Sequence, residues 1–220
     1  IINDRFTRLV RLGLTNFMRR SPDVTTGPVK VQKFGEFTRN LVVPTNLNVV
    51  QIKSLRGTGL IVFEPNLVFS VVDNLFGGDG RYHVRIEGRD FTPTERRIIE
   101  RLLEVVIHEY QNAWAPVHAL ELEFVRSEMN TQFANIASAG ELVVTSSFAV
   151  ELSNAGGNIH ICLPYAALEP LRDVLANVRT GAEAEIDQRW MHMLTRQVQL
   201  AEVQLTAPLA NVKFKIGDLM

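Results

Sequence analysis

The sequence contains a single cysteine, Cys162, so it cannot form an internal disulfide. Disulfide-dense folding is typical of small secreted domains, and its absence favours a reducing compartment. A chain of 220 residues can bury most of its apolar surface without such a cross-link. Cys162 lies in the apolar run 159–163 with no obvious base beside it. We therefore expect a core thiol and not a nucleophile.

Long apolar runs are also missing. No stretch reaches the roughly 18 residues that a membrane-spanning helix needs, and the chain opens with an amphipathic pattern and not with a secretory signal. It does not begin with Met, so we expect a fragment of a longer protein. These features predict a soluble, cytoplasmic protein with no direct insertion into a membrane.

Neither sign of charge dominates, because 23 Lys and Arg face 24 Asp and Glu, for a formal net charge of -1. This balance gives no electrostatic basis for nucleic-acid binding by the whole chain. Five arginines nevertheless share one face of a helix predicted over residues 3–20: Arg5, Arg8, Arg11, Arg19 and Arg20. That face is either simply solvated or a docking surface for an acidic neighbour. Nucleic-acid binding is the third reading, because no aromatic residues are interleaved with these arginines. For the second reading we single out Arg8 and Arg11 as contacts between copies of the chain.

Signatures of catalysis and of cofactors are lacking as well. No Gly-rich stretch ends in Gly-Lys-Ser/Thr, and the five histidines lack metal-ligand spacing. Ser146-Ser147 lies inside a strand pattern, without the sharp turn that exposes a nucleophile. We therefore predict no cofactor, no metal site and no catalytic residue.

Apolar periodicity predicts four helices and six strands. The start of the second long helix is the clearest, since Thr92-Pro93-Thr94-Glu95 is a capping box with proline at the first helical position. The predicted helices cover 3–20, 65–76, 92–114 and 164–175. The predicted strands cover 48–55, 60–63, 82–87, 120–126, 142–152 and 158–163.

Two strand-to-helix junctions look alike, Leu60–Pro65 and Ile159–Pro164, and the two long helices are offset by a similar interval. We interpret this as an internal duplication. It predicts an α/β (α+β) fold, in which pseudo-twofold related helix–strands–helix units form a mostly antiparallel sheet flanked by helices. The composition shifts after Val178. We assign residues 1–178 to this domain, 179–196 to a linker and 197–220 to the truncated start of a second domain.

The segment Gly77-Gly78-Asp79-Gly80 places three glycines in four positions. A helix C-cap followed by an Asp-Gly turn accounts for two of them. The alternative is a loop where another chain approaches a backbone without side chains. Composition alone leaves both readings open.

Several segments, in the same order, resemble the flagellar motor switch FliM family. They are PTNL at 44–47, LVFSVVDNLFGGDG at 67–80, FTPTERRIIERLLE at 91–104 and LPYAALEPL at 163–171. The tail at 201–220 is similar to the opening of the C-terminal (SpoA) domain that FliM shares with FliN. The resemblance implies that residues 1–178 form a FliM middle domain with the fold of the CheC and CheX chemotaxis phosphatases.

The same resemblance implies a non-enzymatic component of the C ring, at the flagellar basal body on the cytoplasmic side of the inner membrane. Such a protein would bind FliG, neighbouring FliM copies and, through its C-terminal domain, FliN. Phosphorylated CheY would bind an N-terminal segment missing from this sequence, and the domain would transmit that signal to set the direction of rotation. The FliG contact is assigned to Phe76, Gly77, Gly78, Asp79, Gly80 and Phe133, the last placed in the loop after the second long helix.

The strongest enzymatic alternative is a CheY-phosphate phosphatase of the CheC/CheX type. Those relatives carry an acid–amide pair one turn apart on each long helix, which can orient an attacking water. Here Glu109 and Asn112 have that spacing, but Gly13 stands three residues before Asn16, and Val105 replaces the expected Asp or Ser. We therefore reject this activity. A generic secretion adaptor is disfavoured because it would not need the Gly-rich loop and the capped helix together.

Overall fold

The computed structural model describes residues 1–42, 45–55, 57–78, 90–152, 155–176, 193–197 and 199–200. The chain divides into two compact units, Ile1–Val178 and Arg179–Met220. Within the described residues, no helix combines the length and the apolar character needed to cross a membrane. The predicted strand over 82–87 and most of the tail beyond Val178 lie outside the described residues, so the linker and the second domain stay predictions.

The first unit contains two long helices, several short helices and seven strands among its described residues. In order they are α1 (Ile2–Met18), β1 (Asp23–Thr26), β2 (Lys30–Lys33), α2 (Phe34–Arg39), β3 (Asn46–Ile52), η1 (Lys53–Leu55), β4 (Gly57–Phe63), α3 (Pro65–Leu75), α4 (Pro93–Trp114), β5 (Leu122–Glu128), β6 (Leu142–Leu152), β7 (Ala155–Pro164), α5 (Tyr165–Leu168), η2 (Glu169–Leu171) and α6 (Arg172–Ala176).

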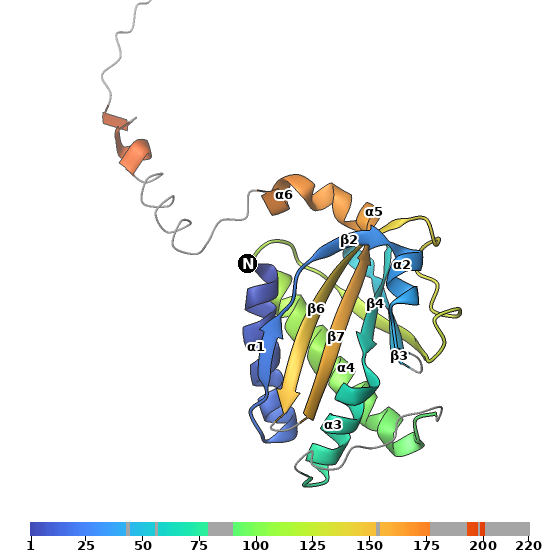
Figure 1. The fold of residues 1–220 in the computed structure, drawn as a ribbon. Coiled ribbons are helices and arrows are strands. Elements are labelled where there is room, and N and C mark those ends of the chain that lie inside the picture. The colour runs from blue at the N-terminus through green and yellow to red at the C-terminus, as the bar shows by residue number, and fades with distance from the viewer. Residues whose placement is uncertain are drawn as a thin grey trace, which may run out of the picture. The chain divides into compact units, whose positions relative to one another are not determined.

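The described strands form one antiparallel sheet in the order β1-β6-β7-β4-β3-β5, with β2 also paired to β6. β4 and β7 lie at its centre, with Leu60 opposite Cys162 and Phe63 opposite Ile159. β3 and β6 flank this pair. The first strand of each half of the unit pairs with a strand of the other half, since β1 pairs with β6 and β5 pairs with β3. This mirrored order confirms the predicted pseudo-twofold and the mostly antiparallel sheet flanked by helices (Figure 1).

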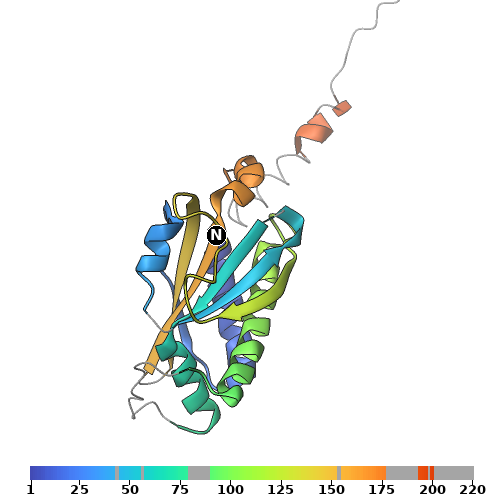
Figure 2. The same ribbon diagram turned by 90° about the vertical axis from the view of Figure 1, so that its right-hand side faces the viewer.

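The main core lies between the sheet and the two long helices, α1 and α4. Phe6 of α1 stands near its centre and meets Tyr110 and Phe148 edge-on, at ring-centroid distances of 5.2 and 4.7 Å. Such edge-to-face pairs add to the free energy gained by burying the rings. The view in Figure 2 shows α1 and α4 side by side against one face of the sheet.

A second, smaller core lies on the opposite face, beneath α2. Its residues come from β3, β4, β6 and β7, from α2 and from the segment after β5: Phe34, Phe37, Leu47, Val49, Leu60, Val62, Ala134, Val143 and Cys162. Burial raises the pKa of the Cys162 thiol well above its usual range. The thiol is therefore held in its neutral form, as expected for a core residue.

The edge strand β5 contains a β-bulge. Val50 of β3 stands opposite Phe124, whereas the preceding residue Val49 stands opposite Arg126, so Val125 is the extra residue. Phe124 and Val125 are both exposed, at 41% and 49%. The bulge lets β5 change the sheet face that its odd and even residues occupy.

The structure differs from the predicted elements in several places. The first helix covers Ile2–Met18 and not 3–20, so Asn3 lies inside it, and its Nδ2 donates to Ser146 Oγ at 3.1 Å. The helix predicted over 164–175 is interrupted by the 3₁₀ turn η2, because Pro170 has no backbone N–H to continue the α-helical ladder. β1, β2 and α2 were not predicted.

Candidate functional site

The helix α3 ends in a Schellman motif that uses the first two glycines of the predicted loop. The Gly77 N–H donates to the Asn74 carbonyl at 3.1 Å, and the Gly78 N–H donates to the Asp73 carbonyl at 2.8 Å. Gly77 has a φ of 88°, in the left-handed region that suits glycine. The C-cap reading of these residues is therefore correct.

The side chain of Phe76 projects from this helix end and is 73% exposed. A Cβ on Gly77 would meet nothing within 4 Å, so that side of the turn is open. A Cβ on Gly78 would overlap the Asp73 carboxylate, so a side chain there would have to displace it. The end of α3 thus presents an exposed ring beside a backbone without side chains. Asp79 and Gly80 lie outside the described residues.

One further contact joins this turn to another helix. The guanidinium of Arg20, just beyond α1, donates from Nη1 to the Gly78 carbonyl at 3.1 Å. The preceding residue, Arg19, closes α1 with a φ of 59°. Sequence reasoning missed this pairing because 58 residues separate its two members.

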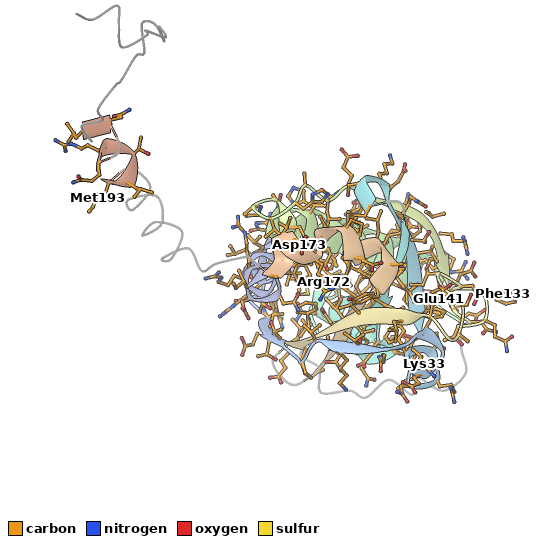
Figure 3. The ribbon with its side chains drawn as sticks, turned by 90° about the horizontal axis from the view of Figure 1, so that it is seen from above. Lys33, Phe133, Glu141, Arg172, Asp173 and Met193 are labelled. Atoms are coloured by element: carbon orange, nitrogen blue, oxygen red, sulfur yellow. The ribbon has the colours of Figure 1, made fainter. Side chains whose placement is uncertain are left out.

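We predicted that Phe133 lies in the loop directly after the second long helix. This is wrong, because β5 lies between α4 and Phe133. It lies in a turn after β5, where its N–H donates to the Asn130 carbonyl at 3.1 Å, and its own carbonyl accepts from Arg126 Nη2 at 3.3 Å. Its side chain is 62% exposed and lies at the outer edge of the unit (Figure 3).

The segment that carries Phe133 packs on α2, since the N–H groups of Phe34 and Gly35 donate to the carbonyls of Glu141 and Ala139. In Figure 1 this segment lies beside α2, whereas α3 runs toward the opposite end of the sheet. The two predicted aromatic anchors therefore belong to different regions of the surface.

Arg8 and Arg11 are exposed on the outer face of α1. The opposite face of the helix is buried through Phe6, Val10, Leu14 and Met18. The predicted division of this helix into an apolar and a basic face is therefore present. Within the described part of the chain, neither guanidinium forms a salt bridge with a carboxylate, so both can meet solvent or a neighbour.

The seam between the two long helices bears on the phosphatase alternative. Gly13 of α1 faces α4 so closely that a Cβ there would lie 2.8 Å from Val105 Cγ1. On α4, Asn112 Nδ2 donates to Glu109 Oε2 at 3.3 Å, so the acid and the amide bind each other. Asn16 of α1 is exposed and has no acid one turn before it. An acid–amide pair with the expected spacing therefore occurs on α4 but not on α1.

A polar cluster at the start of α3 was not predicted. Glu64 accepts from the backbone and side-chain N–H groups of Asn158, each at 3.0 Å, and lies 3.0 Å from His160 Nε2. The hydrogen bond from His160 is the main reason why the pKa of the Glu64 carboxyl lies below its usual range, although burial opposes this. His160 Nδ1 is 3.0 Å from Ser147 Oγ.

This Ser–His–Glu sequence of contacts does not form a hydrolase site. Ser147 lies within β6 and is paired with His160 across the ladder to β7, so it is not on the exposed, strained turn that a nucleophile needs. The cluster instead ties Glu64, the residue just before α3, to the central strand β7. Among the described residues, no group of His, Cys, Asp and Glu side chains could hold a metal ion.

The comparison with protein families decides the relationship. The model of the family described as "Flagellar motor switch protein FliM" matches residues 1–179, which is most of the chain. The chain belongs to the FliM family. FliM of Salmonella typhimurium is 48% identical over 221 residues, covering 100% of this chain and 66% of that protein. FliM of Pseudomonas aeruginosa is 44% identical and is covered to 68%. The chain thus spans about two thirds of the length of these FliM proteins.

Solved FliM structures share the fold. The crystal structure of the FliM middle domain from Vibrio alginolyticus is 44% identical, with a TM-score of 0.72, over 79% of this chain and 96% of that one. The FliM chain of a FliG–FliM complex from H. pylori also gives 0.72, at 24% identity over 77% and 92%. FliY from Thermotoga maritima gives 0.67 at 12% identity over 81% and 93%. The last two show the fold alone.

Proposed function

We propose that this chain is a non-enzymatic component of the flagellar motor switch, in the cytoplasmic C ring at the base of the flagellum. It binds FliG and neighbouring FliM subunits and transmits the chemotaxis signal that sets the direction of rotation. Membership of the FliM family supports this function. A solved complex of a relative, from H. pylori, contains FliG and FliM together.

The proposed FliG contact is supported by the exposed surface at the end of α3. Phe76 is the most exposed of the large apolar side chains in the described residues, and it stands beside the open face of Gly77. Aromatic side chains that enter a partner's pocket often dominate the free energy of binding. A turn without Cβ atoms lets a partner helix or loop approach the backbone. We place the primary contact at Phe76, Gly77 and Gly78, with Asp79 and Gly80 as its sequence-based extension.

The test replaces Phe76 by Ala and measures affinity for purified FliG. We expect binding to weaken by about 30-fold, corresponding to roughly 2 kcal/mol at an interface centre. The melting temperature should stay close to wild type, because the ring is exposed and its loss leaves no cavity. Leu12→Ala is the matched control, since Leu12 is 63% exposed on α1. Wild-type affinity of Phe76→Ala in a folded protein would show that the end of α3 is only a turn.

Phe133 is tested separately, because it lies on another part of the surface. If FliG spans both regions, Phe133→Ala weakens binding and its effect adds to that of Phe76→Ala, as expected for distant sites. If Phe133→Ala binds normally, the FliG contact is confined to the end of α3.

For contacts between FliM copies we propose the basic face of α1, through Arg8 and Arg11, against an acidic stretch of the next subunit. Exposed ion pairs are weak and screened by salt, so this association should loosen as ionic strength rises. Arg8→Glu with Arg11→Glu should reduce crosslinking between copies. The charge-matched control is Arg97→Glu with Arg101→Glu, since both of these arginines are exposed on α4. Crosslinks that form equally well in the double variant would rule out this face.

The proposed contacts with FliN and with phosphorylated CheY involve other segments. FliN would bind through the C-terminal domain that residues 197–220 begin, and CheY through a segment that precedes residue 1. Both proposals rest on the likeness to the FliM family and not on the described residues.

A further inference from the structure

The ends of α1 and α3 meet, although they are far apart in the sequence. A hydrogen bond between them runs from Arg20 Nη1 to the carbonyl of Gly78, at 3.1 Å. The Gly78 N–H is already used by the Asp73 carbonyl at 2.8 Å. Both backbone polar groups of Gly78 are therefore held, one from within α3 and the other from outside it.

The conformation of the preceding residue lets Arg20 reach this carbonyl. Arg19 has φ 59° and ψ 19°, and its N–H donates to the Thr15 carbonyl at 2.9 Å. Among the described residues it is the one non-glycine residue with a positive φ. A left-handed residue at a helix end turns the chain sharply, and for most side chains it is unfavourable. Such conformations persist where the surrounding contacts compensate for them.

We propose that Arg20 is a positioning residue for the FliG contact. By holding the Gly78 carbonyl it presets the turn after α3, and with it the ring of Phe76 and the open side of Gly77. A surface that is already ordered loses less conformational entropy when its partner binds. The inference rests on the proposed function, because it concerns the contact assigned there. It adds that α1, which carries the proposed self-association face, is physically joined to the FliG-binding turn.

A second explanation must be separated from this one. Arg20 is a cation, and a cation can speed the approach of an acidic partner without ordering anything. Lysine keeps the positive charge and N–H donors on a single nitrogen, whereas methionine keeps much of the side-chain length and loses both the charge and the donors. The dynamics of the turn, which a steering charge does not alter, distinguish the two explanations.

The experiment compares Arg20→Met, Arg20→Lys and the control Arg5→Met in the full chain. Two quantities are measured for each: amide hydrogen exchange at Gly77 and Gly78 in the free protein, and the affinity for purified FliG. We expect Arg20→Met to speed exchange at Gly78 several-fold and to weaken FliG binding about fivefold, as for the loss of one hydrogen bond. Arg20→Lys should restore part of both, and Arg5→Met should change neither.

Each other outcome decides against the proposal or a part of it. Wild-type exchange and affinity in Arg20→Met would show that the hydrogen bond orders nothing. If Arg20→Lys restores affinity but not slow exchange, charge is responsible and positioning is wrong. If the wild-type chain does not bind FliG, the proposed function fails first. In that case exchange alone decides whether Arg20 holds the turn, and the claim about affinity is lost.

Discussion

α1 and α4 occupy equivalent places in the two halves of the domain, yet their ends are built differently. α4 begins with a full capping box, in which Thr92 accepts from the Glu95 N–H and Glu95 accepts from the Thr92 N–H. α1 begins without a side-chain cap, and its C-cap residue, Arg19, has a left-handed backbone conformation. Duplicated units therefore kept the packed position of the helix while its termini and polar faces diverged. The shared feature is packing, and the differences lie where a helix meets solvent or a partner.

The largest expected effect is at the seam that the two helices share. In Gly13→Val the new side chain would overlap Val105 Cγ1, 2.8 Å from the ideal Cβ position, and crowd Glu109. Overpacking of this kind costs about 1–3 kcal/mol, against which the gain in helix propensity is small. Urea unfolding should show a lower midpoint with an unchanged slope. The exposed substitution Leu12→Val should shift the midpoint little. An unaltered midpoint in Gly13→Val would mean that the helices can separate freely.

The next effect is confined to the start of α4. Thr92→Ala removes the hydroxyl that accepts the Glu95 N–H, and caps of this type contribute about 1 kcal/mol. Thr94→Ala, two residues along on the exposed side of the same turn, should leave the free energy of unfolding unchanged to within about 0.5 kcal/mol. Equal effects of the two substitutions, measured by urea unfolding, would show that the capping box does not stabilise α4.

The two long helices were not predicted equally well from the sequence, because only α4 carries strong local signals. The helix predicted over 92–114 matches α4, because a capping box and a wide apolar band are local signals. The end of the first helix was placed two residues late, since nothing local announces an arginine in the left-handed region. β1 and β2 were missed because they are four residues long and mostly exposed. Their strand conformation comes from pairing with β6, which lies over a hundred residues away.

The candidate site divides in the same way. The Gly-Gly turn after α3 was predictable, because adjacent glycines after an apolar helix are typical of a C-cap. The contact of Arg20 with that turn was not, since it depends on how α1 and α3 pack. The Glu64–His160 pair was missed for the same reason: its members are 96 residues apart and meet across two central strands.

A smaller effect is expected at the end of α1. Arg19→Gly removes the strain of a side chain at φ 59°, which is on the order of 1 kcal/mol. Part of this gain is offset, because glycine increases the conformational entropy of the unfolded chain. We expect a net stabilisation of about 0.5 kcal/mol, visible as a slightly higher midpoint in urea. A lower midpoint would mean that the Arg19 side chain makes contacts worth more than the strain.

The smallest expected effect concerns catalysis. Since the acid–amide pair of α4 has no counterpart on α1, the purified chain should not shorten the lifetime of CheY-phosphate. CheY-phosphate should therefore lose phosphate at its spontaneous rate in the presence of the wild type, of Glu109→Ala or of Asn112→Ala. Acceleration by the wild type that disappears in either variant would make α4 catalytic, and would restore the phosphatase alternative.

The bulge in β5 has a consequence for how the free domain behaves in solution. A flat edge strand offers a row of unpaired backbone groups with which a strand of a second chain can pair. Exposed apolar residues on that strand strengthen the association. β5 exposes Phe124 and Val125 at such an edge. The extra residue interrupts the regular spacing of donors and acceptors and twists the strand locally. An edge that would otherwise template aggregation is thereby kept from matching a straight strand of another molecule.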